Sequence, residues 1–214
     1  NPYQNGDTEG IFAPWAIYKK DYWKTGGHDK LFAPQSKEDS DIFNRFHLLD
    51  YKFIQTWKGL VYHMTSRGSR FNPLSGGAPG KDSPEWIHTT TKNMRNFIRK
   101  WGTMVQHDKH MKPIVSHKYD IGFVAHNCNK HLLKELEPWC SKIYLDTGSD
   151  YIHDYRIEEQ PNTDYDLDEK IKLYGWTKPK DLKHDIVVEF DARKLNGENF
   201  QIIVKLADIL RDSG

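Results

Sequence analysis

The first regular pattern of hydrophobic and polar residues lies between residues 36 and 49. Its hydrophobic members recur every three or four positions, at Ile42, Phe43, Phe46 and Leu49. That spacing places side chains on one face of a helix. Ser36 stands three residues before Asp39, which predicts a capping box and a helix that begins near residue 37. Residues 53–57 and 60–63 predict two short extended segments after it, with His63 at a strand end.

The aromatic residues near the start of the chain also have helical spacing. They are Phe12, Trp15, Tyr18, Tyr22 and Trp23. Spacings of three and four predict one buried helix face. Trp15 is the exception we expect, as an acceptor-binding residue, because a pyranose presents an apolar C–H face that stacks on an aromatic ring.

The second half of the chain alternates strand-like and helix-like patterns. Residues 72–82 contain two prolines and three glycines, which predicts a loop that divides the chain. An amphipathic helix is expected after it, over residues 91–101. Strands are expected over residues 121–125, 142–145 and 186–191, and helices over residues 130–139 and 200–210. A turn is expected over residues 146–150, and a polar loop with at most one short helix over residues 158–184.

This alternation predicts an α/β fold in two parts, residues 1–105 and 106–214. The three predicted strands of the second part should be neighbours in one sheet, with right-handed connections where they are parallel. Asp146 and Asp191 follow two of these strands. We therefore expect both aspartates at the carboxyl edge, where open α/β sheets bind ligands.

Composition and charge narrow the class of protein. Lysine and arginine number 31 against 30 aspartates and glutamates, so the chain lacks the broad positive field of a protein that holds nucleic acid by its phosphates. No apolar run approaches the roughly 20 residues that span a bilayer, so we expect no transmembrane segment. Cys128 and Cys140 have neither zinc nor redox spacing, which favours a reduced, cytoplasmic setting. Because the chain begins Asn1-Pro2 without methionine, we expect a fragment or a processed form.

Three acidic residues fall in the first turn of the helix predicted near residue 37: Glu38, Asp39 and Asp41. A helix N-terminus stabilises anions, so a carboxylate there stays ionised and ready to accept a proton. Sugar transfer with inversion requires such a base for the acceptor hydroxyl and a divalent cation for the departing diphosphate. Ordinary helix capping explains the same three acids, and both interpretations stay open at this point.

The residues around these acids resemble a known family. A Gly-Gly-His-Asp turn at residues 26–29 precedes the segment from Glu38 to Arg45, in an order similar to the acceptor half of GT-A glycosyltransferases. The beta-galactosyltransferases and the large inverting family two are the closest in pattern, and the resemblance covers residues 10–71. It implies a GT-A-like mixed sheet flanked by helices. The family has an aromatic residue where His28 stands, a difference that affects packing more than chemistry.

The resemblance also implies roles for individual residues. Asp39 would be the catalytic base, Glu38 or Asp41 would orient the acceptor, and Gly26 and Gly27 would lie at the acceptor site.

The segment Val61-Tyr62-His63, followed by Ser66-Arg67, looks like the galactosyltransferase strand whose histidine binds manganese ahead of a Ser-Arg pair. His63 would then hold Mn or Mg, and Arg67 would lie near the nucleotide. A structural histidine is the alternative for His63.

In this family a nucleotide-binding half with an Asp-x-Asp metal motif precedes the acceptor half. Here, residues 119–191 resemble the opening of a family-two enzyme instead. That likeness implies nucleotide binding by Asn127 and Asp146, and a metal motif at Glu189 and Asp191. An acid at a strand end is common in any α/β protein, so a structural role is the alternative.

If this second likeness holds, the GT-A domain is truncated or permuted, by circular permutation or as a piece of two tandem domains. Residues 10–71 should then pack on the carboxyl edge of the predicted sheet, in the same chain or in a swapped homodimer.

Taken together, the sequence predicts a metal-dependent glycosyltransferase. It would move a sugar from a nucleotide-sugar donor to a hydroxyl of a glycan or other acceptor. One alternative is a non-catalytic carbohydrate- or partner-binding module derived from a GT-A domain, and another is a metal-dependent hydrolase that uses the same acids and histidine. His107, His110 and His117 lie in a Lys-rich loop without an acid or cysteine at ligand spacing, which favours solvated histidines there.

Overall fold

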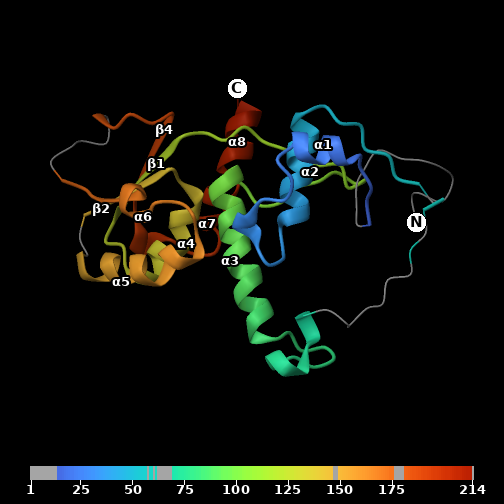
Figure 1. Ribbon diagram of the computed structural model, residues 1–214. Coiled ribbons are helices and arrows are strands. Elements are labelled where there is room, and N and C mark those ends of the chain that lie inside the picture. Colours follow the sequence, from blue (N-terminus) through green and yellow to red (C-terminus); the bar gives the residue numbers. More distant parts are fainter. Residues whose placement is uncertain are drawn as a thin grey trace. The chain divides into compact units, whose positions relative to one another are not determined.

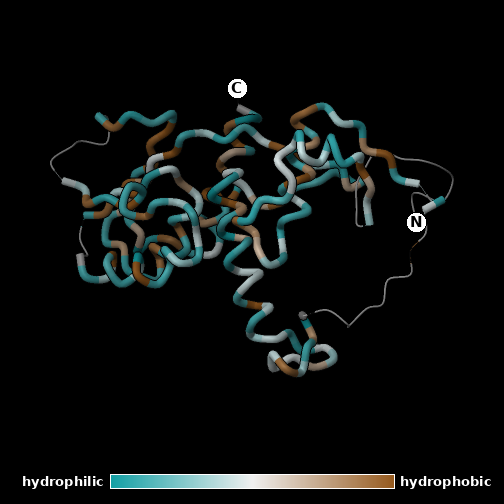
Figure 2. The backbone as a smooth tube through the Cα atoms, in the orientation of Figure 1, coloured by the Kyte–Doolittle hydropathy of each residue, from teal (hydrophilic) through white to brown (hydrophobic). Residues whose placement is uncertain are grey.

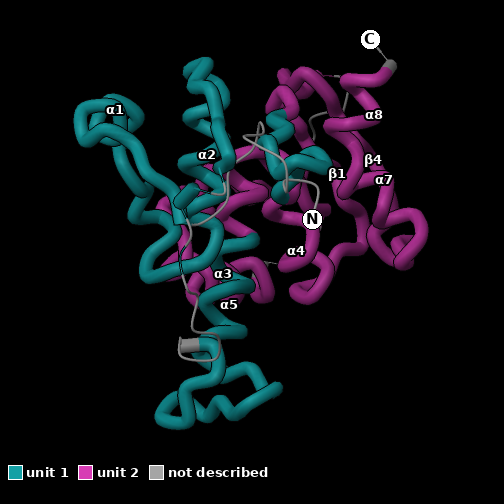
Figure 3. The backbone as a smooth tube through the Cα atoms, turned by 90° about the vertical axis from the view of Figure 1, so that its right-hand side faces the viewer, with its two compact units in different colours: residues 1–94, 105–115 teal, residues 95–104, 116–214 magenta. Residues whose placement is uncertain are grey.

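A computed structural model describes residues 14–56, 58–59, 61, 69–146, 149–175 and 181–213. The chain forms two compact units, shown in different colours in Figure 3. Unit 1 consists of residues 1–94 and 105–115, and unit 2 of residues 95–104 and 116–214. The helix α3 (Pro84–Trp101) passes from one unit to the other. The loop predicted to divide the chain, residues 72–82, lies within unit 1.

Unit 1 is built from short helices (Figure 1). Before α3, these are α1 (Lys19–Lys24), η1 (Lys30–Phe32), α2 (Glu38–Leu48), η2 (Ser69–Phe71) and η3 (Pro73–Ser75). The hydrophobic core of α2 consists of Ile42, Phe43 and Phe46, joined by Phe53. The sequence therefore located this helix and three members of its buried face, whereas Leu49, the fourth predicted member, is the C-cap residue and is 49% exposed.

The start of α2 differs from the prediction. Its N-cap residue is Lys37, which has a left-handed backbone (φ 72°) and makes no side-chain capping hydrogen bond. Ser36 is also left-handed, with φ 79°. Two successive residues with positive φ turn the chain abruptly into the helix, so the predicted capping box between Ser36 and Asp39 is wrong.

Two other predictions for this part of the chain are wrong. The helix α1 is only six residues long and buries none of them, so it cannot form the buried face expected of the early aromatic residues. Tyr18 and Trp23 are 78% and 62% exposed. Tyr22 and Trp15 do pack against the core around α2, and Phe12 lies outside the described residues. Residues 53–56 form no continuous strand, and most of the segment 60–63, with His63, lies outside the described residues.

Unit 2 contains a four-stranded parallel sheet in the order β3-β2-β1-β4. Its strands are β1 (Ile121–His126), β2 (Lys142–Leu145), β3 (Ile171–Leu173) and β4 (Ile186–Asp191). Phe123 lies opposite Ile143 on one side and Val188 on the other. The first five residues of β1 are buried, as expected for the interior strand of a parallel sheet. The expectation that β2, β1 and β4 are neighbours is confirmed.

Helices accompany this sheet, and the fold class α/β is confirmed. They are α4 (Lys130–Leu136), η4 (Glu137–Trp139), α5 (Ser149–Glu159), η5 (Gln160–Asn162), α6 (Leu167–Lys170), η7 (Ala192–Lys194), α7 (Phe200–Val204) and α8 (Leu206–Ser213). Hydrophobic and hydrophilic positions alternate over short stretches along most of the backbone (Figure 2), as amphipathic elements require. None of the helices in the described part of the chain has the length and apolar character that crossing a membrane demands.

The sequence patterns did not predict α5 or β3, and they predicted one final helix where the structure has two, α7 and α8. Residues 149–159 are mostly polar, and only Ile152 and Tyr155 supply buried apolar surface there, so the helical period is weak. The strand β3 is three residues long. The final helix is interrupted at Lys205, between the two predicted halves of its hydrophobic face.

A buried ionic network holds the elements of unit 2 together. Arg99 Nη2 lies 2.6 Å from Glu137 Oε2 and 2.5 Å from Glu159 Oε1. Lys170 Nζ lies 2.7 Å from Glu137 Oε1. Arg99 and Glu137 have fully buried side chains. The network links α3, η4, α5 and α6, because each contributes one of these four charges.

Candidate functional site

The carboxylate of Asp39 stands in the first turn of α2 and meets two aromatic rings. Trp15 Nε1 donates a hydrogen bond to Asp39 Oδ1 at 3.3 Å. His28 Nε2 lies 3.7 Å from the same oxygen. The Asp39 side chain is 44% exposed, so a ligand can reach it. Among the described residues, both contacts fall on Oδ1 and none on Oδ2.

Both aromatic partners of Asp39 are held by their neighbours. Trp15 packs edge-on against Phe43 and Phe46, with ring centroids 5.7 Å apart in each case. His28 Nδ1 lies 2.9 Å from the Tyr22 hydroxyl, which also accepts a hydrogen bond from the His28 amide at 3.0 Å. The sequence predicted that a histidine at position 28, in place of the aromatic residue of the family pattern, would affect packing more than chemistry. In the structure His28 lies beside the Asp39 carboxylate and so also contributes to its polar environment.

Asp41 has a different environment from Asp39. Its side chain is fully buried and pairs with Arg45 at 2.8 Å. The guanidinium of Arg45 also donates to the carbonyl oxygens of Thr25 and Gly27. Because a buried carboxylate in an ion pair cannot reach an acceptor, the expectation that Asp41 orients the acceptor is not supported by its position. The pair instead holds the glycine turn against α2.

Gly26 and Gly27 form that turn, with φ values of 86° and 68°. Left-handed backbone of this kind favours glycine. A Cβ atom on Gly27 would also lie 3.1 Å from the ring of Tyr22. The glycines thus shape the loop that carries His28, and their predicted contact with an acceptor stays a prediction.

A cleft of about 470 Å³ opens beside Asp39, entirely within unit 1. Residues 35–40 form one side of it. Trp86, His107 and Met111 are among the residues that line the rest. No sequence pattern indicated this arrangement, because these residues follow the segment that resembles glycosyltransferases and come from α3 and from a loop.

A second group of polar side chains lies at the carboxyl edge of the sheet in unit 2. The amide of Asn127 donates to both carboxylate oxygens of Asp146, at 3.0 and 3.1 Å. His126 lies between two acids, with Nε2 2.8 Å from Glu189 Oε1 and Nδ1 3.4 Å from Asp146 Oδ2. Asp191 lies opposite His126 in the β1–β4 register. The residues predicted to bind nucleotide, Asn127 and Asp146, and those predicted to bind metal, Glu189 and Asp191, are thus at one edge of the sheet.

This edge coincides with a reversal of the strand order. From β1 the chain adds β2 and β3 on one side and β4 on the other. Crevices outside such switch points are where open α/β sheets bind ligands. The position of Asp146, at the end of the second strand, matches that of an acid that contacts a ribose in nucleotide-binding sheets.

Charge pairing alters proton binding at this edge. The hydrogen bond to Glu189, reinforced by Asp146 and opposed by partial burial, raises the pKa of His126. Hydrogen bonds from Arg193 hold the pKa of Asp191 well below its usual range. His126 and Arg193 were not anticipated, although His126 directly precedes Asn127 and follows the buried run of β1.

The predicted metal site is not assembled by the described residues. The carboxylate of Asp191 receives Arg193 Nε at 3.1 Å and Nη2 at 2.7 Å, so a guanidinium occupies both of its oxygens. Within the described ranges, no three His, Cys, Asp or Glu side chains are grouped as metal ligands. His63 and Arg67 lie outside these ranges, and the Mn or Mg ion stays a prediction.

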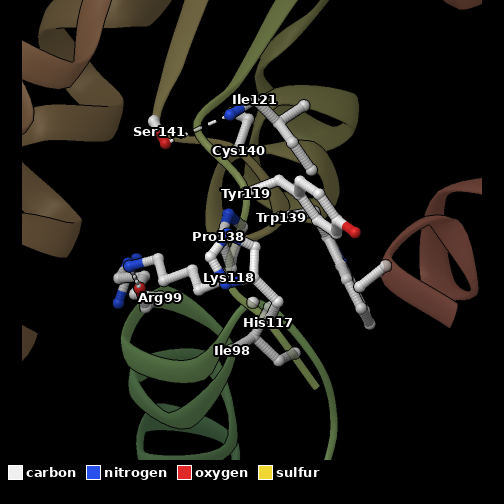
Figure 4. Close-up of a pocket in the computed structure, with 12 residues that line it drawn as sticks. Ile98, Arg99, His117, Lys118, Tyr119, Ile121, Pro138, Trp139, Cys140 and Ser141 are labelled. Atoms are coloured by element: carbon white, nitrogen blue, oxygen red, sulfur yellow. Dashed lines mark hydrogen bonds between the residues drawn. The ribbon is translucent and has the colours of Figure 1, made fainter. Parts of the chain in front are cut away.

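A smaller cavity in unit 2 has no room for a ligand (Figure 4). Its volume is about 10 Å³, enough for one water at most. Lys118 closes one side and donates to the carbonyl oxygen of Arg99 at 2.6 Å. The buried thiol of Cys140 also lines it, and burial raises the pKa of that thiol to about 12, so it is unreactive at neutral pH.

Comparison with protein-family models, with curated proteins and with solved structures gives no match for this chain.

Proposed function

We propose that this chain carries the acceptor-binding and base-supplying part of a glycosyltransferase that uses a nucleotide-sugar donor. One observation carries the proposal: Asp39 is a solvent-accessible carboxylate in the first turn of α2, fixed through Oδ1 by Trp15, beside a cleft of ligand size. Clefts of roughly 300–1,000 Å³ are typical of small-molecule sites.

In the proposed reaction, Asp39 Oδ2 accepts the proton of an acceptor hydroxyl. The freed oxygen attacks the anomeric carbon of the donor sugar, a new C–O bond forms, and the bond to the diphosphate breaks. The nucleoside diphosphate leaves with the electron pair of that bond. Glu38, which also lines the cleft, is the proposed orienting group for the acceptor, in place of the buried Asp41.

A nucleotide-binding role is proposed for the carboxyl edge of the sheet in unit 2. Support comes from the strand order β3-β2-β1-β4 and from Asn127 and Asp146 at its switch point. A divalent cation, if His63 binds one as the sequence predicts, would supply positive charge for the diphosphate. The described residues give no further support for that ion.

A thermal-shift experiment tests the donor part of the proposal. The chain is heated with UDP, with Mn²⁺, and with both together. A donor site predicts that the melting temperature rises more with both than with either alone, because ligands that bind only the folded state stabilise it. The variant Asp146→Asn should lose most of that rise. Glu135→Gln, which changes an exposed carboxylate near the carboxyl end of α4, should keep it. An unchanged melting temperature in all mixtures would contradict a UDP-sugar donor site.

Incubation with a UDP-sugar then separates transfer from hydrolysis. A sugar joined to an added acceptor supports a glycosyltransferase. Release of free sugar in the absence of any acceptor supports the metal-dependent hydrolase instead. Binding of a glycan without either product supports the non-catalytic module.

A further inference from the structure

The cleft beside Asp39 has two walls of different origin. One wall is residues 35–40, which belong to the segment that resembles glycosyltransferases. The other includes Trp86 from the first turn of α3, and Val105, Met111 and Pro113 from the segment after that helix. The second wall adds apolar and aromatic surface to a site whose first wall is polar.

The second wall is preorganised by its own hydrogen bonds. Residues 107 and 113 form an antiparallel bridge. Inside the loop, the Asp108 carboxylate accepts hydrogen bonds from the amides of His110 and Lys112, at 2.7 and 3.0 Å. These backbone bonds, that of Lys112 first, lower the pKa of Asp108. These bonds hold the backbone on both sides of Met111.

Trp86 is fixed as well. Its amide donates to Ser83 Oγ at 3.1 Å, and the guanidinium of Arg70 lies 5.9 Å from its ring centroid. A cation over an indole is attracted by the ring quadrupole. The half-buried indole is thus held at the cleft while part of it stays accessible.

The first wall offers both hydrogen-bond donors and acceptors. The first amides of a helix have no partner within the helix, and α2 has no side-chain cap. Glu38 Oε2 is buried and has no hydrogen-bond partner among the described residues. A buried carboxylate oxygen without a donor is costly, so a ligand that brings a donor is favoured at this position.

The ligand that fits these walls is neutral and rich in hydroxyls. A hydroxyl both donates to a carboxylate and accepts from an amide. An anion would meet two carboxylates, Glu38 and Asp39, against the single ammonium of Lys37. Sugar rings add the apolar C–H face that an indole can stack on. A cleft of about 470 Å³ belongs to the size class of drug-sized ligands, and a single hexose is smaller than those.

We infer that Trp86 and the 105–113 loop form an extended acceptor subsite, which binds sugar units of an oligosaccharide beyond the unit that reacts at Asp39. This inference rests on the proposed role of Asp39 for its place in the reaction. The binding itself depends only on the cleft. Trp86 stacks on one sugar ring, and Met111 covers its apolar edge.

Calorimetric titration of the whole chain tests the subsite. The probes are glucose and cellotriose, and N-acetylglucosamine and triacetylchitotriose. At least one trisaccharide should bind about five- to tenfold more tightly than its monosaccharide, as expected for one added aromatic stacking contact. Trp86→Ala should remove that difference and Trp86→Phe should keep part of it. Ile87→Ala, an exposed neighbour outside the cleft, should leave it unchanged, and circular dichroism verifies that all variants are folded.

The outcomes separate this inference from the proposed function. Equal affinity for monomer and trimer, no binding of any probe, or full retention of the difference in folded Trp86→Ala would overturn the extended subsite. Asp39→Asn should bind the trisaccharide normally and lose only transfer. If that variant transfers sugar at the wild-type rate while Trp86→Ala still loses trisaccharide binding, the proposed base is wrong and the subsite stands.

Discussion

The indole of Trp15 donates its only N–H to Oδ1 of Asp39, at 3.3 Å, from a position 24 residues earlier in the chain. The hydrogen bond restrains the carboxylate through Oδ1, and Oδ2 has no hydrogen bond or ion pair among the described residues. Since Trp15 also packs on Phe43 and Phe46, one ring connects the core of unit 1 to the proposed base.

Trp15→Phe separates these two functions of the ring. Phenylalanine keeps an aromatic ring on the core but removes the N–H donor. We expect kcat for sugar transfer to fall by about tenfold, with a loss of stability below about 1.5 kcal/mol. Steady-state kinetics and denaturant unfolding give the two quantities. Trp23→Phe, the same change at a 62% exposed site, serves as control, and an equal loss of kcat in both variants would contradict the role of Trp15.

Asp41→Ala tests the structural role of the buried pair. It leaves the guanidinium of Arg45 without its carboxylate, and removing one partner of a buried ion pair costs about 3–5 kcal/mol. We therefore expect a large drop in the free energy of unfolding of unit 1, measured by denaturant titration. Asp50→Asn, at an exposed position, should change that free energy by less than about 0.5 kcal/mol. A fully stable Asp41→Ala protein that lost only acceptor affinity would restore Asp41 to the acceptor site.

The ionic network in unit 2 predicts acid sensitivity. Burial alone would raise the pKa of Glu137, but Lys170 and Arg99 outweigh it and hold that pKa well below its usual range. A depressed carboxyl pKa stabilises the folded state above the unfolded-state value of about 4.3 and loses this contribution as pH falls below it.

Glu137→Gln isolates that contribution. The variant should be less stable at neutral pH by about 3–5 kcal/mol, because the buried Arg99 and Lys170 then lose the carboxylate that they share. The difference from wild type should shrink as pH falls below about 4.3. Urea unfolding at several pH values measures it, and a difference independent of pH down to the acid limit would contradict this account.

Gly122 allows His184 to lie against β1. A Cβ atom at residue 122 would stand 2.4 Å from Cδ2 of His184, whose ring bridges Asp120 and Tyr144 with hydrogen bonds of 2.9 Å each. Gly122→Ala should therefore destabilise unit 2 by about 1–3 kcal/mol, the usual cost of overpacking. Gly197→Ala, where a Cβ meets nothing within 4 Å, is the control. Equal melting temperatures of the two variants would refute the close approach.

Three of the four strands could be predicted from the sequence because their patterns are local. The apolar run from Ile121 to Ala125 and the aspartates at the ends of β2 and β4 can each be recognised within a single strand, and parallel pairing then brings the strand ends together. The helix α5 could not be predicted in this way, because its sequence is mostly polar and buries few side chains. Its stability comes from tertiary partners such as the ionic network around Glu137.

The candidate site in unit 1 was only partly predictable. An acid in the first turn of a helix is a local signal that Glu38, Asp39 and Asp41 share, and only the resemblance to glycosyltransferases singled out Asp39. The contacts of Trp15 and His28, and the cleft wall at Trp86, depend on how distant segments pack, and no spacing in the sequence encodes them. The burial of Asp41 beside Arg45 arises from the same packing.

The most direct test of the central claim is the rate of sugar transfer by Asp39→Asn. Asparagine keeps the shape of the side chain and can still accept the hydrogen bond from Trp15, but it cannot take up the acceptor proton. A general base contributes about 10²–10⁴-fold, so transfer should fall by at least a hundredfold while Asp50→Asn keeps the wild-type rate. Retention of more than about a tenth of the activity in a folded Asp39→Asn protein would contradict the assignment of Asp39 as the base.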